Sequence, residues 1–246
     1  MTPGVIITGA SGGIGRALCV EFKKNGYFTL GVDKEPEAPK EADAYLCFDL
    51  SLLAKNESSQ ESFKREVESR FKGHALKSII NNAAVQILGS TDQIKIKDWE
   101  DTLQLNLLAP FFVVQLFKKT LSEQKGSVIN IASIHASLTK SKFICYATSK
   151  SALIGLTRAL ALDLAPHIRV NAISPAATDT PMLREGFKDS PEKMKELSDC
   201  SPLGRIATPA EVAKVAVFLS SSDSSFISGS TIQVDGAVGC RLHDPV

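Results

Sequence analysis

Several features that would assign this sequence of 246 residues to a class of protein are missing from it. No apolar run approaches the about 20 residues that a membrane-spanning helix needs. Basic and acidic residues nearly balance, and the formal net charge of +1 indicates no basic surface for nucleic acid or an anionic membrane. We therefore expect a globular protein with neither nucleic acid nor a membrane as a partner.

Cysteine is scarce, and its spacing fits no metal site. The N-terminus offers only the short apolar run from Val5 to Ile7 before a glycine-rich turn, so we expect no secretory signal peptide. Reduced thiols, no bound metal and a cytoplasmic location are the resulting expectations. The five cysteines are Cys19, Cys47, Cys145, Cys200 and Cys240.

Short β-rich apolar runs alternate along the chain with longer segments of helical periodicity. Strands are predicted over 5–7, 27–32, 44–48, 78–81, 127–131, 168–173 and 231–234, and helices over 13–25, 58–71, 98–122, 145–164 and 209–220. Such alternation is typical of a parallel sheet covered by helices on both faces. We predict an α/β fold, a single Rossmann-type domain over 1–246 with a doubly wound parallel sheet of about seven strands.

Three places depart from this rhythm. Residues 33–43 are rich in proline and charge, which predicts a loop or a single turn between two strands. Residues 180–202 are polar with proline, glycine and methionine, which predicts two short helices forming a substrate lid. Pro110 predicts a break in the helix over 98–122.

A glycine-rich turn, residues 8–15, joins the first strand to the first helix and has the sequence Thr-Gly-Ala-Ser-Gly-Gly-Ile-Gly. Glycines there permit a tight turn and a close approach of backbone N–H groups to a pyrophosphate, and the helix dipole favours the negative charge. Such a turn can be purely structural, but its place in a βαβ unit predicts a dinucleotide site. The predicted contacts are Gly9, Ser11, Gly13, Ile14 and Gly15.

Asp33 follows the second strand at the distance expected for a residue that contacts adenosine. A carboxylate there accepts hydrogen bonds from the ribose hydroxyls and repels a 2′-phosphate. The sequence therefore predicts NAD as the cofactor, and Lys34 is the neighbouring residue that could soften this preference.

Tyr146 and Lys150 lie four residues apart at the start of a long predicted helix, and therefore on one face of it. A free phenol has a pKa of about 10, and lowering it by about 3 units needs roughly 4 kcal/mol of differential stabilisation. A nearby ammonium and a positive nicotinamide would contribute to that. By itself, such a pair is common on helices and indicates little.

The combination of motifs resembles the short-chain dehydrogenase/reductase family over essentially the whole chain. The resemblance depends on the glycine turn at 8–15, Asn81-Asn82-Ala83-Ala84, Asn106, Ser133, Tyr146 with Lys150, and the tail over 228–236. It implies an oxidoreductase that transfers a hydride between a secondary alcohol or ketone and C4 of the nicotinamide.

The resemblance also implies a role for each of four candidate catalytic residues. Tyr146 would exchange a proton with the substrate oxygen, and Lys150 would lower the pKa of Tyr146 and hold the nicotinamide ribose. Ser133 would orient the substrate oxygen. Asn106 would bend its helix and help to hold a water that relays protons to Lys150.

Further cofactor contacts follow from the same resemblance. Asn82 and Ala83 would line the adenosine side, Asp49 and Leu50 would cap the adenine, and Pro175, Thr178 and Thr180 would lie at the nicotinamide and pyrophosphate. Ala84 and Ala176 replace glycines that are frequent in the family. Gly12 stands where carrier-protein ketoreductases often have an arginine for the NADP phosphate, which again favours NAD.

The expected substrate pocket includes Gln86, Ser133, His135 and Arg184. Gln86 and His135 fall where the family's 3-hydroxybutyrate dehydrogenases place carboxylate-binding side chains, and Arg184 could add a bidentate clamp. The lysine of that branch is replaced by Phe143, with Lys142 one position away. We expect a small hydroxy acid or another polar secondary alcohol as substrate.

Two alternatives stay open. One is an NADPH-dependent 3-oxoacyl reductase of the same family. The other is a dinucleotide-binding protein without catalysis, although such proteins typically lose the tyrosine, lysine or serine that this chain keeps. Related dehydrogenases usually form tetramers through the helices predicted over 98–122 and 145–164, so a homotetramer is expected.

Overall fold

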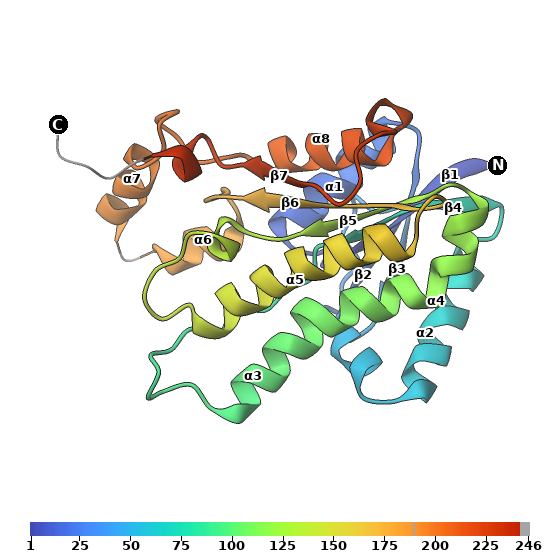
Figure 1. The fold of residues 1–246 in the computed structure, drawn as a ribbon, viewed down its shortest axis with the longest axis horizontal. Helices are drawn as coiled ribbons and strands as arrows, with labels where there is room; N and C mark the ends of the chain where they lie inside the picture. Colours follow the sequence, from blue (N-terminus) through green and yellow to red (C-terminus); the bar gives the residue numbers. More distant parts are fainter. Residues whose placement is uncertain (189, 242–246) are drawn as a thin grey trace.

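Seven parallel strands form one sheet in the computed structural model, which describes residues 1–188 and 190–241. The sheet has the order β3-β2-β1-β4-β5-β6-β7 (Figure 1). The predicted fold class is confirmed; residues 189 and 242–246 of the predicted domain lie outside the described residues. The strands are β1 Thr2–Thr8, β2 Phe28–Asp33, β3 Ala44–Cys47, β4 His74–Asn81, β5 Ser127–Ile131, β6 Arg169–Pro175 and β7 Thr231–Val234.

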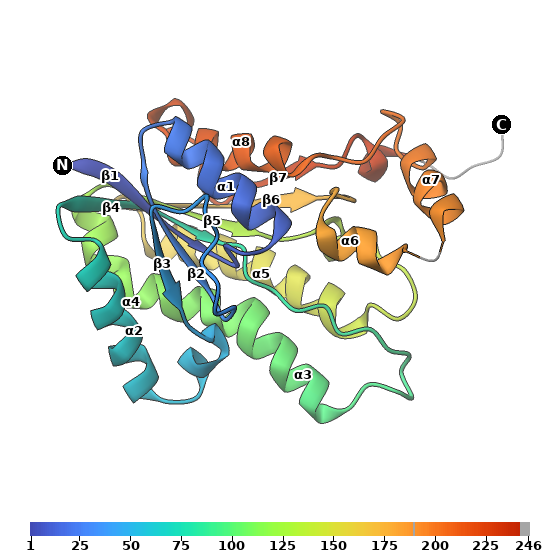
Figure 2. The ribbon, with the colours of Figure 1, turned by 180° about the vertical axis from the view of Figure 1, so that it is seen from behind.

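Helices cover both faces of the sheet (Figures 1 and 2). On one face lie α1 (Gly13–Lys24) and α8 (Pro209–Ser220), and on the other lie α2 (Glu57–Arg70), α4 (Ala109–Glu123) and α5 (Ile144–Asp163). In the part of the chain that the structure describes, no helix is both long enough and apolar enough to cross a membrane.

The apolar residues of each central strand serve two cores. In β1, Ile6 belongs to the core under α2, α4 and α5, whereas Val5 and Ile7 belong to the core under α1 and α8. Successive side chains of a strand point to opposite faces, and both faces are buried here. This is why the strand sequences show no alternation of apolar and polar residues.

The helix predicted over 98–122 is interrupted. It consists of α3 (Ile96–Leu103), a π-helical segment η2 (Gln104–Leu108) and α4. Pro110 follows directly, and because it has no N–H it cannot donate the α-helical hydrogen bond to the carbonyl of Asn106. The predicted break is therefore present, just before the proline, and it places Asn106 in the irregular turn.

The largest error in the predicted elements concerns the start of β4. The prediction began at Ser78, whereas the strand begins at His74, which pairs with Thr2 of β1. The four residues from His74 to Lys77 have no β-branched side chain, so the sequence carries no local strand signal there. The polar segment over 33–43 forms no helix, as predicted.

The segment predicted as a lid does contain two short helices, α6 (Pro181–Gly186) and α7 (Pro191–Asp199). Figure 2 shows them beyond the tip of β6, at the carboxyl edge of the sheet. We call α6 and α7 together the lid segment.

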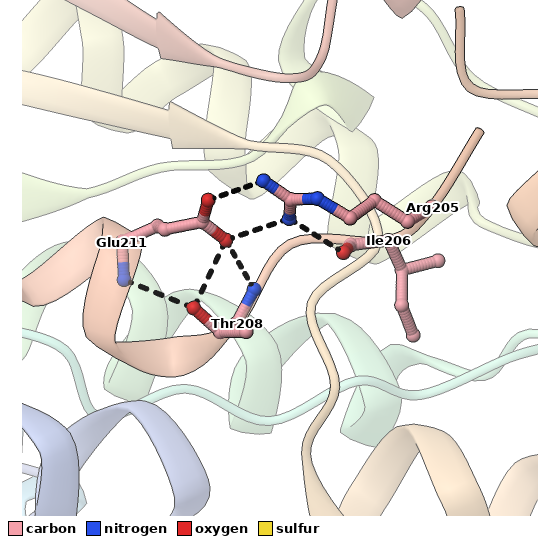
Figure 3. Close-up of polar contacts among 4 residues, drawn as sticks. All are labelled: Arg205, Ile206, Thr208 and Glu211. Carbon is pink, nitrogen blue, oxygen red and sulfur yellow. Dashed lines mark hydrogen bonds and ion pairs between the residues drawn. The ribbon is translucent and has the colours of Figure 1, made fainter. Parts of the chain in front are cut away.

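The chain after the lid segment is anchored at the start of α8 (Figure 3). The Arg205 guanidinium donates to both carboxylate oxygens of Glu211, at 2.6 and 2.9 Å. Glu211 also accepts from the backbone N–H and the hydroxyl of Thr208, at 2.7 and 2.9 Å, and the Thr208 hydroxyl caps the helix. These partners lower the pKa of Glu211 to about 2, so its carboxylate stays ionised at any ordinary pH.

All five cysteines are free, as expected. Cys19 and Cys145 are buried, and burial raises the pKa of both thiols. Among the described residues, no three His, Cys, Asp or Glu side chains are placed to hold a metal ion.

Candidate active site

The chain reverses its direction of winding between β1 and β4, and a hydrogen-bond cluster joins the ends of these two strands. The Thr8 hydroxyl accepts from the backbone N–H groups of Asn82 and Ala83, at 2.9 and 3.0 Å. The Asn82 side-chain amide donates to the carbonyls of Thr8 and Gly9, at 3.0 and 3.1 Å. Asn82 therefore holds the glycine turn in place.

The glycine turn fits a pyrophosphate. Gly9 has a φ of +66°, and a Cβ there would lie 2.8 Å from the Cα of Ala83. A Cβ on Gly15 would lie 2.0 Å from the carbonyl oxygen of Gly9. Gly12 is the N-cap of α1 and offers no side chain as a cap, so the amides of the first turn are left to a ligand. Within the described residues, the buried Ser11 hydroxyl has no hydrogen-bond partner.

Asp33 lies at the end of β2 with its carboxylate beside the turn. Its two oxygens accept from the backbone N–H groups of Ser11 and Lys34, at 3.0 and 2.8 Å. These bonds fix the orientation of the carboxylate at the place where a ribose hydroxyl would donate to it.

The other predicted cofactor contacts lie along the same edge of the sheet. Pro175 ends β6, and Thr178 is buried shortly after it. Thr180 caps α6 and lies so close to the glycine turn that a Cβ on Gly13 would be 2.9 Å from it. The other two predicted cofactor contacts are Asp49, which caps the short helix η1 (Leu50–Ala54), and buried Leu50.

Lys150 is buried in the second turn of α5, with 2% of its surface exposed. Its Nζ donates to the carbonyl of Ile131 at 2.7 Å and lies 5.7 Å from the ring centroid of Tyr146. Burial lowers the pKa of Lys150 to about 8. The ammonium is therefore protonated at neutral pH and loses its proton as the pH rises through about 8.

Tyr146 differs from the expectation in the direction of its pKa shift. Burial raises the pKa of the phenol above its ordinary value, and the hydroxyl of Ser133 opposes that shift. In the chain alone, desolvation is thus the largest influence on this pKa. The phenol is therefore neutral at neutral pH in the chain alone, and the positive charge of a bound nicotinamide would lower its pKa.

Asn106 connects two parts of the site. Its side-chain carbonyl accepts from the N–H of Val85 at 2.8 Å, and its amide donates to the Val85 carbonyl and to the Ser149 hydroxyl, at 2.9 and 3.0 Å. Ser149 donates in turn to the carbonyl of Tyr146 at 2.7 Å. The sequence analysis did not single out Ser149 or Thr8, although both lie inside its motifs.

The three predicted substrate contacts beyond Ser133 have different surroundings. Gln86 is exposed, and His135 bonds Thr139 through Nδ1 at 3.1 Å. Arg184 is paired with Asp179 through two hydrogen bonds of 2.6 and 2.7 Å. Within the described ranges, no hydrogen bond joins any of the three to another.

Arg184 lines a cavity of about 430 Å³ at the lid segment. Asp179, Phe187, Met194 and Ile206 complete the lining that is described. The cavity therefore has three apolar side chains and one ion pair.

Comparison with known proteins agrees with this geometry. A family model described as enoyl-(acyl carrier protein) reductase matches residues 9–238. Dehydrogenase/reductase SDR family member 6 of Xenopus laevis is 31% identical over 239 residues, which cover 94% of this chain and 95% of the relative. The chain belongs to the short-chain dehydrogenase/reductase family. The 3-oxoacyl-[acyl-carrier-protein] reductase FabG of Thermotoga maritima is 32% identical over 248 residues, covering 95% of this chain and 96% of the relative.

Solved structures of the family are similar throughout. Ligand-free aldohexose dehydrogenase of Thermoplasma acidophilum has a TM-score of 0.91 at 29% identity and covers 100% of this chain and 97% of its own. ElxO with NADP bound has a TM-score of 0.87 at 25% identity, covering 98% of this chain and 100% of its own. A 3-ketoacyl-(acyl-carrier-protein) reductase from Brucella melitensis complexed with NADH has a TM-score of 0.85 at 25% identity, covering 96% of this chain and 98% of its own. The two structures hold different dinucleotides. As a member of this family, the protein is an oxidoreductase that binds a nicotinamide dinucleotide.

Replacing Gly9 tests the fit of the glycine turn. Gly9→Ala forces a methyl group against Ala83, so we expect dinucleotide affinity, measured by calorimetry, to fall by at least about tenfold. Gly26→Ala is the matched control, because Gly26 also has a positive φ but nothing lies within 4 Å of its added Cβ. Equal affinities for the two variants would contradict the assignment of the turn.

Proposed function

We propose that the protein is an NAD-dependent dehydrogenase that interconverts a secondary alcohol and a ketone, with Tyr146 as its acid and base. The observation that carries this proposal is the position of buried Lys150 one turn beyond Tyr146 on α5, with its Nζ 5.7 Å from the centroid of the phenol ring. Ser133 supports it, because its hydroxyl opposes the rise in the pKa of Tyr146 that burial causes. The bound nicotinamide supplies or accepts the hydride.

The chain's own residues handle the proton. In reduction, Tyr146 donates its proton to the substrate oxygen, which Ser133 orients by a hydrogen bond. The raised pKa of Tyr146 suits this direction, because the phenol is protonated at neutral pH. In oxidation, the Lys150 ammonium favours the phenolate, and this help is lost as the pH rises through about 8.

Removal of the phenol hydroxyl tests the central role of Tyr146. Tyr146→Phe should lower kcat/KM for NAD-linked alcohol oxidation by about 10³-fold, since one general acid and base is removed. NAD affinity, measured in parallel by calorimetry, should change little. A variant that retains most of its activity would show that another group moves the proton.

The preference for NAD is supported by the fixed carboxylate of Asp33 at the glycine turn. Asp33→Asn should raise the KM for NAD by about tenfold and lower that for NADP, because a charged acceptor is lost and a repulsion is relieved. Glu35→Gln is the control, since the Glu35 carboxylate forms no hydrogen bond to the glycine turn among the described residues. The second candidate function is an NADPH-dependent 3-oxoacyl reductase, which the similarity to the Thermotoga protein favours. A preference of the wild-type protein for NADP over NAD would support this candidate against the NAD-dependent dehydrogenase.

A hydroxy acid is the substrate class that we propose, with α6 and α7 as the lid over it. The Arg184–Asp179 pair lies at the surface, where solvent and salt screen it, so a substrate carboxylate can compete with Asp179 for the guanidinium. Phe187, Met194 and Ile206 offer an apolar surface to the carbon chain. Exposed Gln86 is a further donor for the carboxylate.

Two variants of the ion pair separate this role from a structural one. Arg184→Ala should raise the KM for 3-hydroxybutyrate by about tenfold or more and leave that for uncharged alcohols unchanged. Asp179→Asn should instead lower the KM for the acid, because the guanidinium is freed. Indifference of the acid's KM to Arg184→Ala would contradict the clamp.

We further propose a cytoplasmic homotetramer. Free thiols at Cys47, Cys200 and Cys240 are exposed, which suits a reducing compartment. The helices α4 and α5 carry apolar side chains that their own chain covers only in part, and Leu162 of α5 is 83% exposed. Light scattering should give about four times the 26.4 kDa of one chain, and a monomeric mass would refute the tetramer.

A further inference from the structure

Two aromatic rings of the site are stacked on each other beside Tyr146. The imidazole of His135 lies parallel to the ring of Phe143, with a centroid distance of 4.2 Å and an interplanar angle of 8°. Both rings meet Tyr146 edge to face, His135 at 5.9 Å and Phe143 at 6.2 Å, each at an angle of 76°. Three rings thus form one packed unit.

The stack joins the two segments that carry the candidate catalytic hydroxyls. His135 lies in the short helix η3 (Ile134–Ala136), which is capped by the Ser133 hydroxyl. Phe143 is the N-cap of α5, three positions before Tyr146. The stack therefore bridges the turn of Ser133 and the helix of Tyr146, and it is in direct contact with the tyrosine.

We propose that the stack of His135 on Phe143 is a positioning device that holds the ring of Tyr146 at a fixed place relative to Ser133. The inference depends on the proposed function, in which both hydroxyls contact the same substrate oxygen. Small displacements of such groups are costly, because a misplacement of about 1 Å can lower a rate by about 10²-fold.

The surroundings of His135 do not suit carboxylate binding, the role that the family resemblance implies. One of its nitrogens is bonded to Thr139, and one ring face is covered by Phe143. Burial and the charge of Lys140 lower its pKa, so the imidazole is neutral at physiological pH. Lys140 also lies over the Phe143 ring, 4.9 Å from its centroid.

A second contact joins the same two segments without touching the tyrosine. The Ser151 hydroxyl of α5 donates to the carbonyl of Ala136 at 2.8 Å. The joint between η3 and α5 therefore survives loss of the stack, and removal of the imidazole should change the freedom and hydration of Tyr146 more than the fold.

Hydration gives the proposal a spectroscopic signature. Charged groups near Tyr146 include Lys150 on its own helix, Lys140 beyond the stack, and Asp98, which acts on neighbouring Cys145; the adjacent imidazole is neutral. Burial is the main reason that the phenol's pKa is raised. If the His135 ring is removed, water reaches the phenol and its pKa should fall toward the ordinary value of about 10.

The test compares three variants. His135→Ala removes the stack, and His135→Phe keeps an aromatic ring while losing the nitrogens. His74→Ala is the matched control, because His74 makes an equivalent stack with Phe28 (3.9 Å, 3°) at the start of β4, the other end of the sheet. For each variant, kcat and KM of alcohol oxidation and the Tm of thermal unfolding are measured. The titration of Tyr146 is followed by ultraviolet absorbance, as the difference between the variant and the same variant carrying Tyr146→Phe.

We expect His135→Ala to lower kcat by about tenfold and to shift the Tyr146 titration to lower pH. His135→Phe should restore kcat to within about threefold of wild type and return the Tyr146 titration to the wild-type pH. His74→Ala should lower Tm without changing kcat or the titration. The proposal is overturned if His135→Ala leaves kcat and the Tyr146 titration unchanged. It is also overturned if His135→Phe lowers kcat as much as His135→Ala does and raises the KM for acids, because the imidazole would then be a substrate ligand. The titration needs no substrate, so it tests the stack even if no alcohol is turned over.

Discussion

The hydroxyl of Thr8, hydrogen-bonded to the backbone of Asn82 and Ala83 across the ends of β1 and β4, is the contact on which the rest of the site depends. It lies where the winding of the sheet reverses, and the Asn82 side chain returns two bonds to the carbonyls of Thr8 and Gly9. Loss of the hydroxyl would leave two partly buried amides without an acceptor, at a cost of about 1–3 kcal/mol each. The glycine turn, and with it the start of α1, is held in the shape that suits a pyrophosphate.

The candidate catalytic groups are placed by elements that end or bend at the same edge of the sheet. Asn106 stands in the π-helical segment before α4 and is tied through Ser149 to the helix of Tyr146. Burial acts on Lys150 and Tyr146 in opposite senses: it lowers the pKa of the amine and raises that of the phenol. Both shifts favour neutral groups, so the charge of the cofactor is the component that completes the electrostatics of the site.

The sequence predicted the fold well because its signals are local. The strand Ser127–Ile131 and the helix Pro209–Ser220 agree with the predicted bounds, since a short apolar run marks the strand and a capping threonine marks the start of the helix. The first half of β4 has no such signal, because its pairing with β1 is set by tertiary structure. Likewise, the pairing of Arg184 with Asp179 and the stacking of His135 depend on loop conformation, which residue spacing does not encode.

A crystal structure of the complex with NAD tests the account most directly, because every assignment depends on where the dinucleotide lies. The account predicts the pyrophosphate at the N-terminus of α1, the adenosine ribose hydroxyls within hydrogen-bond distance of Asp33, and the nicotinamide ribose beside Lys150 with its ring facing Tyr146. A dinucleotide bound away from the glycine turn, or one with its nicotinamide remote from Tyr146, would contradict it.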